Sequence, residues 1–114
     1  MVGRKNRFHG HGSLRYVYNN GKTVRGPLCA LKFAPNDRRT EYRLAIVVSK
    51  KVHKSAVVRN RIRRRLYEAF RHESAAFRGA YDLVVTVFNE QLATIPAEEV
   101  QKLVHAQLKQ AKVI

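Results

Sequence analysis

The residues of this sequence best suited to binding chemistry are arginines, six of which lie within residues 59–71. An arginine guanidinium is planar, stays charged at neutral pH and binds a phosphate through two parallel hydrogen bonds. Asn60 lies between two of these arginines, and its amide can donate hydrogen bonds to, and accept them from, a base edge or a ribose hydroxyl. Three lysines precede the group. The candidate nucleic-acid-binding residues are Lys50, Lys51, Lys54, Arg59, Asn60, Arg61, Arg63, Arg64, Arg65 and Arg71.

The composition of the whole chain indicates the same class of partner. Its 114 residues include 23 Lys and Arg against 8 Asp and Glu, a net charge of +15 with His neutral. Such a charge favours binding to a polyanion, of which nucleic acid is the commonest and a membrane surface the second. A charged run is often only a solvated helix face, but such faces mix signs, whereas only Glu68 and Glu73 oppose the six arginines.

The arginines belong to a predicted helix over residues 56–72. Apolar residues recur in this segment at helical spacing, at Val58, Ile62, Leu66, Ala69 and Phe70. Arginines in the first two turns oppose the positive end of the helix dipole, at a cost of about 0.3–1 kcal/mol each. On a helical projection the arginines flank both sides of the apolar stripe and cover the outward face. The helix therefore gives up stability to display guanidinium groups.

The remaining elements that position these residues follow from similar patterns. A helix from Ser13 ends at Asn20-Gly21, a pair suited to a left-handed helix end. We expect the strands at 28–33 and 42–48 to run antiparallel, and the strand–helix–strand unit over 42–88 to have parallel strands. The element order α-β-β-α-β-α predicts an α+β fold, a two-layer sandwich with a small mixed sheet. The expected parts are a flexible basic arm at 1–12, a single domain at 13–114, helices at 13–20, 56–72 and from 96, and strands at 28–33, 42–48 and 81–88.

Other residue types predict little catalytic chemistry. His9 and His11 lack the third ligand that a metal site needs, and the carboxylates are too scattered to predict a hydrolytic centre. Cys29 is the only cysteine, which excludes a disulfide framework and favours a reducing compartment. No apolar run approaches the ~20 residues of a membrane span, and no secretory signal follows the basic N-terminus. We therefore expect a cytoplasmic protein with no catalytic residue and no metal held by the protein alone.

The run Ser49-Lys-Lys-Val-His-Lys-Ser-Ala-Val-Val-Arg-Asn-Arg-Ile-Arg-Arg64 closely resembles the protein component of bacterial ribonuclease P. Glu68-Ala-Phe-Arg71 is similar to the end of that family's basic helix, and the similarity extends from Arg7 to about Leu108. The Arg-Asn-Arg motif in this context is specific, unlike a bare run of arginines. Leu14 and Tyr67 depart from the residues usual in the family.

The resemblance implies a basic subunit for a catalytic RNA that removes the 5′ leader from precursor tRNA. The implied partners are that RNA, bound by the arginine-rich helix, and the precursor tRNA, while the protein alone is monomeric. The implied cofactor is Mg²⁺, bound mainly by the RNA, which carries the chemistry of this endoribonuclease. The resemblance also implies a left-handed β-α-β crossover and a leader-binding cleft between the sheet and the first helix, lined by Leu14, Tyr16, Val17, Tyr18 and Phe33.

Two other functions are compatible with a basic chain. A non-catalytic RNA-binding protein, such as a ribosome-associated one, would bind RNA without stimulating leader removal. A self-sufficient nuclease would use pairs among the five histidines and would cleave precursor tRNA without an RNA subunit.

Overall fold

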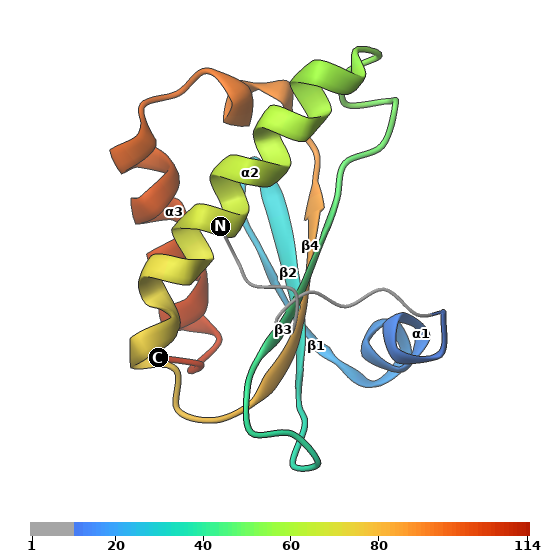
Figure 1. The fold of residues 1–114 in the computed structure, drawn as a ribbon, viewed down its shortest axis with the longest axis vertical. Helices are drawn as coiled ribbons and strands as arrows, with labels where there is room; N and C mark the ends of the chain where they lie inside the picture. The colour runs from blue at the N-terminus through green and yellow to red at the C-terminus, as the bar shows by residue number, and fades with distance from the viewer. Residues whose placement is uncertain (1–10) are drawn as a thin grey trace.

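The structure, a computed structural model, describes residues 11–114. The predicted basic arm lies outside these residues, except for His11 and Gly12, which begin the first helix. A central sheet carries one helix on one face and two helices on the other (Figure 1). The helices are α1 (His11–Asn20), α2 (Ala56–Glu73) and α3 (Ala97–Gln110), the strands are β1 (Lys22–Arg25), β2 (Cys29–Pro35), β3 (Arg43–Val47) and β4 (Tyr81–Val87), and the short 3-10 helices are η2 (Ser74–Ala76) and η3 (Glu90–Ala93).

The sheet has the strand order β1-β2-β4-β3. β2 is antiparallel to both β1 and β4, and β3 is parallel to β4, which confirms the α+β class and the mixed sheet. β2 and β3 run in opposite directions, as predicted, but β4 lies between them. The sequence pattern misses β1, because Val24 is the only buried residue among its four. The element order is therefore α-β-β-β-α-β-α.

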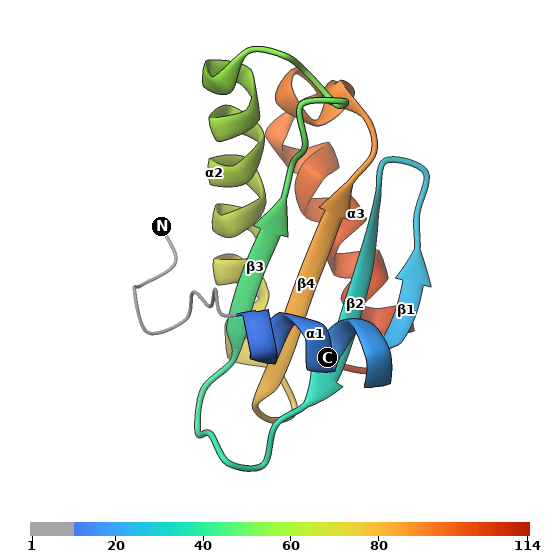
Figure 2. The same cartoon turned by 90° about the vertical axis from the view of Figure 1, so that its right-hand side faces the viewer.

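The connection from β3 through α2 to β4 is a left-handed crossover, as the family resemblance implies. In Figure 2, viewed from the α1 side, β3 and β4 both point upward, β4 lies to the right of β3, and α2 lies behind them. A chain that ascends in front, returns behind and advances to the right makes a left-handed turn. Because about 98% of parallel crossovers are right-handed, the strand and helix pattern alone predicts the opposite hand.

Helices α2 and α3 enclose the main core against the sheet. α2 buries Ile62, Leu66, Ala69 and Phe70, four of the five apolar positions predicted for it, while Val58 is partly buried. Burial of a large apolar side chain contributes about 1.5–3 kcal/mol. These contacts fix α2 on the sheet and determine which of its side chains face outward.

Helix α1 crosses the opposite face of the sheet near one end (Figure 2). Val17 is fully buried there against three residues of the sheet, Ala34, Ala45 and Val84, while Leu14 is only partly buried beside them. Two of these sheet residues are alanines, so the helix approaches the sheet closely. α1 therefore adds a partial third layer to the predicted sandwich.

Gly21 ends α1 through a close approach rather than through a left-handed backbone. Its N–H donates to the carbonyl of Val17 at 2.8 Å. A Cβ at this position would lie 2.5 Å from the Val17 oxygen and 2.8 Å from the Phe33 oxygen, so a larger residue would clash with backbone. The prediction of a left-handed end at Asn20-Gly21 is wrong, because no described glycine has a positive φ.

Candidate nucleic-acid interface

The first turn of α2 is held by an arginine of the helix itself. Ser55 is the N-cap residue but makes no side-chain cap, and its N–H donates to Nδ1 of His53 at 3.0 Å. Nη1 of Arg59 donates to the carbonyl oxygens of His53 and Lys54, at 3.0 and 2.9 Å. Through these two hydrogen bonds from Nη1, Arg59 fixes the loop before α2.

Arg63 makes a similar connection one turn later. Its Nη2 donates to the carbonyl of Val48 at 3.2 Å, at the end of β3, and its Nη1 donates to Oδ1 of Asn60 at 2.7 Å. Asn60 itself is exposed, so its NH₂ group still faces solvent. Arg63 orients this amide and joins α2 to the strand that precedes it.

Two further arginines are also engaged. Nη1 of Arg65 donates to the carbonyl of Leu92 at 2.7 Å, and its Nη2 donates to the carbonyl of Ile95, which ties α2 to the segment leading into α3. Burial lowers the pKa of Arg65, although the group stays charged. Arg71 forms an ion pair with Glu68, which holds the pKa of that carboxyl below its usual range. We call Arg59, Arg63 and Arg65 the anchored arginines.

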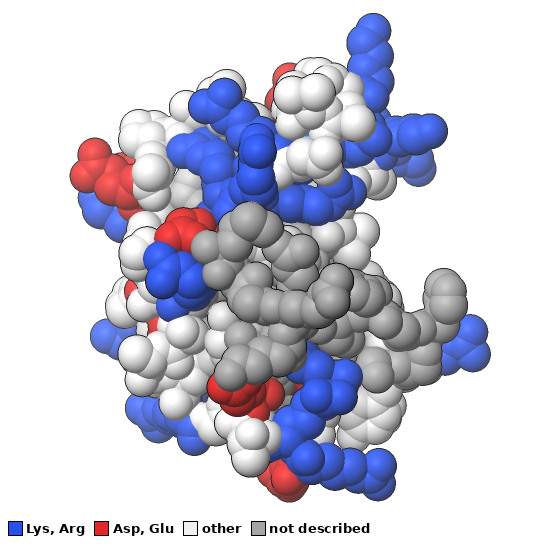
Figure 3. All heavy atoms as spheres, viewed as in Figure 1, with Lys and Arg blue, Asp and Glu red and all other residues white. Residues whose placement is uncertain are grey.

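The remaining basic residues of this segment form an exposed surface. Their side chains make no hydrogen bond or ion pair with any residue that the structure describes. In the space-filling view, Lys and Arg gather over the first turns of α2 and the loop before it, with few acidic side chains among them (Figure 3). Such unscreened cations are what a phosphate backbone binds. The exposed cation group consists of Lys50, Lys51, Lys54, Arg61 and Arg64.

The second predicted site is the leader-binding cleft, and the structure places only some of its predicted residues near one another. Tyr18 is 40% exposed at the edge of α1, and Nζ of Lys32 lies 5.4 Å from its ring centroid and donates to its carbonyl at 3.0 Å. A cation against an aromatic ring stabilises the ring in place. Tyr18 therefore presents a fixed ring at the side of the sheet that α1 leaves open, and Leu14 lies partly buried nearby.

In the structure, Val17 and Phe33 do not line the cleft. Val17 is 0% exposed under α1, so no ligand reaches it. The side chain of Phe33 packs in the main core, on the α2 and α3 face of the sheet. Neighbouring residues of a strand point to opposite faces, and Ala34 is the one that faces α1. The expectation that these two residues line the cleft is wrong.

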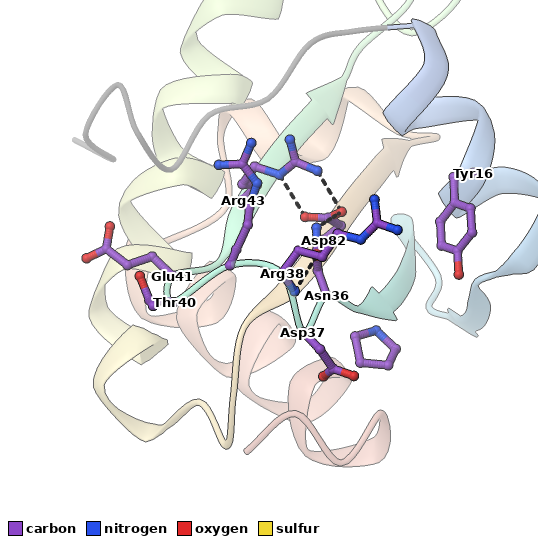
Figure 4. Close-up of a pocket in the computed structure, with 10 residues that line it drawn as sticks. Tyr16, Asn36, Asp37, Arg38, Thr40, Glu41, Arg43 and Asp82 are labelled. Atoms are coloured by element: carbon purple, nitrogen blue, oxygen red, sulfur yellow. Dashed lines mark hydrogen bonds and ion pairs between the residues drawn. The ribbon is translucent and has the colours of Figure 1, made fainter.

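Tyr16 lies on the other side of α1 and lines a different, open pocket of about 990 Å³ at the loop between β2 and β3 (Figure 4). The wall of this pocket is a charged cluster. Arg43 donates from Nε and Nη2 to the two oxygens of Asp82, at 2.8 Å each, and Asn36 donates to the same carboxylate at 2.9 Å. These hydrogen bonds raise the pKa of Arg43. The cluster joins β3 to β4 and fixes the loop, so we assign it a structural role.

The sequence analysis missed two residues on the open face of the sheet. Phe88, directly after β4, is 42% exposed, and the guanidinium carbon of Arg25 lies 5.0 Å from the centroid of its ring. A signal for Phe88 was present in the sequence. In the run from Leu83 to Phe88, Thr86 is the polar member among apolar residues, and Phe88 shares its face by the two-residue period.

The described residues offer little for other kinds of site. Among the residues that the structure describes, no group of three or more His, Cys, Asp or Glu side chains could hold a metal ion. Over the same residues, no helix is long and apolar enough to cross a membrane. Burial raises the pKa of the Cys29 thiol to about 11, which makes it a poor nucleophile.

An α+β domain with an arginine-rich helix surface and an open sheet face is typical of nucleic-acid-binding proteins. A sequence profile of the ribonuclease P family matches residues 2–112. The ribonuclease P protein component of Pseudanabaena sp. is 38% identical over 87 residues, which cover 76% of this chain and 75% of the relative. The one of Chloroflexus aurantiacus is 38% identical over 97 residues, 85% of this chain and 70% of that protein. The chain therefore belongs to the ribonuclease P protein family.

Solved structures agree with this assignment. The RNase P protein of Staphylococcus aureus superposes with a TM-score of 0.83 at 27% identity, over 95% of this chain and 96% of that one. The RNase P protein of Thermotoga maritima superposes with a TM-score of 0.78 at 22% identity, over 90% and 96% of the two chains, and shares the fold.

Proposed function

We propose that this chain is the protein subunit of ribonuclease P, the ribonucleoprotein endonuclease that removes the 5′ leader of precursor tRNA, and that it works in the cytoplasm. The names of its relatives support the assignment. The observation that carries the mode of binding is the exposed cation group, five cations without a partner among the described residues. In this proposal they bind phosphates of the catalytic RNA subunit.

The anchored arginines support this surface without contacting the RNA themselves. They join the start and middle of α2 to β3, to the loop at 53–54 and to the segment before α3. The spacing of Arg61 and Arg64 is thereby fixed before the RNA arrives. A preorganised binding surface loses less conformational entropy on association.

The open face of the sheet is the proposed site of the leader. Tyr18 offers a ring on which a base can stack, and the adjacent Lys32 adds positive charge for the backbone. Stacking on an aromatic ring accepts any base and contributes about 1–3 kcal/mol. Such tolerance suits a subunit that meets many different leader sequences.

Mg²⁺ bound by the RNA subunit would supply the activated water for hydrolysis of the phosphodiester. In this proposal the side chains of the protein bind and orient the two RNAs and hold the leader away from competing contacts.

Reconstitution at low Mg²⁺ tests the proposal. Precursor tRNA is incubated with the catalytic RNA alone, with the protein alone and with both. We expect cleavage at the leader junction only with both components, and no cleavage by the protein alone. Binding without stimulation would favour a ribosome-associated type of RNA-binding protein. Cleavage by the protein alone would favour a self-sufficient nuclease.

A further inference from the structure

The end of the sheet that α1 does not cover carries small side chains on its exposed face. α1 packs on Ala34 near the end of β2, and on Ala45 and Val84 at the middle of β3 and β4. Further along the same face, Thr86 of β4 has Ala30 and Val47 as its register partners on either side. Val47 is 37% exposed, although it is apolar. Ala30 is 7% exposed and Thr86 is partly buried, so this row is a floor of short side chains with Arg25 opposite Ala30 at its edge.

An aromatic ring stands at the far end of that floor. Phe88 follows β4 and is 42% exposed, and its N–H donates to the carbonyl of Leu28 at 2.8 Å, which fixes its backbone. The guanidinium of Arg25 lies over the ring, 5.0 Å from its centroid. A large aromatic side chain that is not buried, and that is held by a cation, has the form of a binding platform.

The hairpin that carries Arg25 is rigidly attached to the domain. Gln107 of α3 is 5% exposed, and its Nε2 donates to the carbonyl of Cys29 at 2.9 Å. The N–H of Gly26 donates to the same carbonyl at 3.0 Å, and a Cβ on Gly26 would lie 2.7 Å from Nε2 of Gln107. The turn after Arg25 is thus locked against α3, so the cation–ring pair is preformed.

We propose that Arg25 and Phe88 form a second base-stacking platform for single-stranded RNA, at the opposite end of the open face from Tyr18 and Lys32. Both platforms pair one ring with one cation, and both face the same side of the sheet. Lys32 is opposite Val84 in the register, and Phe88 lies four residues further along the chain, about 13 Å at the rise of a strand. That distance matches about four stacked nucleotides at about 3.4 Å each. The inference rests on the proposed function, because the strand bound there would be the 5′ leader.

The charge of this face favours RNA over a protein or a membrane. Its two rings carry a cation each, and the exposed cation group lies beyond the end of β3, in the loop that leads to α2 and in α2 itself. A docking protein would bury the apolar rings without needing the cations above them. A nucleotide uses both, since the base stacks on the ring and the phosphate binds the cation.

Leader length provides the test. Holoenzyme reconstituted from the full chain and the catalytic RNA is titrated with mature tRNA and with precursors bearing leaders of two, five and ten nucleotides. We expect Phe88→Ala to weaken binding of the ten-nucleotide leader by about 5- to 100-fold, the effect of losing one stack, and to leave the two-nucleotide leader unchanged. Tyr18→Ala should weaken binding of every leader that reaches its ring. Phe88→Tyr should restore the affinity.

Three controls keep the result interpretable. Phe88→Leu retains apolar volume without the ring, and thermal unfolding of each variant checks that it folds. Arg25→Ala should weaken binding of the long leader, whereas Lys109→Ala, which removes an exposed cation on α3, should not. If the wild type favours long leaders and the Phe88 and Arg25 variants do so equally, the second platform is refuted while the proposed function stands. If the wild type binds all leaders and mature tRNA equally, the proposed leader site itself is refuted.

Discussion

Along α2 the same residue type serves two purposes on different sides of the helix. The anchored arginines donate to backbone carbonyls at the flanks of the apolar stripe, whereas Arg61 and Arg64 face outward with no partner in the described part of the chain. The anchored side chains are partly buried, and the outward ones are exposed. The number of arginines in a basic helix is therefore larger than the number left exposed for a ligand. Mutation of an anchored arginine should change the stability of the fold, whereas mutation of an exposed arginine should change RNA binding.

The largest effect should come from the most enclosed charge pair among residues 11–114, Arg43 with Asp82, whose side chains are 12% and 7% exposed. Asp82→Ala leaves the guanidinium without its carboxylate. We expect the free energy of unfolding to fall by about 3–5 kcal/mol, measured by urea denaturation. Arg43→Met combined with Asp82→Leu should recover most of the loss, since no unpaired charge remains. A loss below about 1 kcal/mol in Asp82→Ala would show that the pair contributes little.

A smaller effect on stability should follow from removing an anchored arginine. Arg65→Ala deletes two hydrogen bonds from a charged donor to the carbonyls of Leu92 and Ile95. We expect the free energy of unfolding to fall by about 1.5–3 kcal/mol, with the salt dependence of RNA binding unchanged. Arg61→Ala, one turn earlier and exposed, is the matched control and should leave stability unchanged. Equal stability of the two variants would remove the distinction between anchored and exposed arginines.

The exposed cations should show the reverse pattern. The double variant Arg61→Ala with Arg64→Ala should keep the wild-type stability, within about 0.5 kcal/mol. Its log affinity for the catalytic RNA should fall less steeply with log salt, by about 0.7–0.9 in slope for each lost phosphate contact. Lys102→Ala with Lys109→Ala removes the same charge from α3 and should preserve the slope. A slope unchanged in both double variants would mean that α2 presents a solvated face and not an RNA-binding one.

The smallest effect concerns Glu68, which lies on α2 beyond the exposed cation group. Arg71 lowers the pKa of this carboxyl in the folded state, and His72 lies 3.3 Å away. A lowered folded-state pKa stabilises the protein above the unfolded pKa of about 4.3, and this contribution is lost as pH falls toward the folded value. Glu68→Gln should therefore reduce the loss of stability on acidification, measured as the melting temperature between pH 6 and pH 3. An identical acid profile would show that the pair contributes nothing.

Much of α2 is predictable from the sequence, because its apolar spacing is local. Ile62, Leu66, Ala69 and Phe70 are buried as the periodicity predicts. The partners of the anchored arginines are not predictable in this way. Arg65 reaches carbonyls that lie 27 and 30 residues further along the chain, and only the packing of α3 brings them within reach. A helical projection gives the direction of a side chain but not what it meets there.

The face of the sheet proposed to bind the leader is less predictable from the sequence for a related reason. The two faces of β2 follow from the strand period, since Ala30, Lys32 and Ala34 alternate with Leu31 and Phe33, which pack in the main core. Family resemblance placed Phe33 in the cleft against that alternation, and the alternation was the better guide. The position of β1 and the hand of the crossover depend on long-range pairing that no local pattern contains.

Because β4 lies in the interior of the sheet, the sheet can form only after most of the chain has been synthesised. β3 has its only strand neighbour in β4, and β2 has one of its two there, although β4 is the last of the four strands to leave the ribosome. Until residue 87 has emerged, two apolar strands have unpaired edges, a condition that favours aggregation. An incomplete chain that stops before β4 would therefore carry the whole arginine-rich helix without the sheet that holds it.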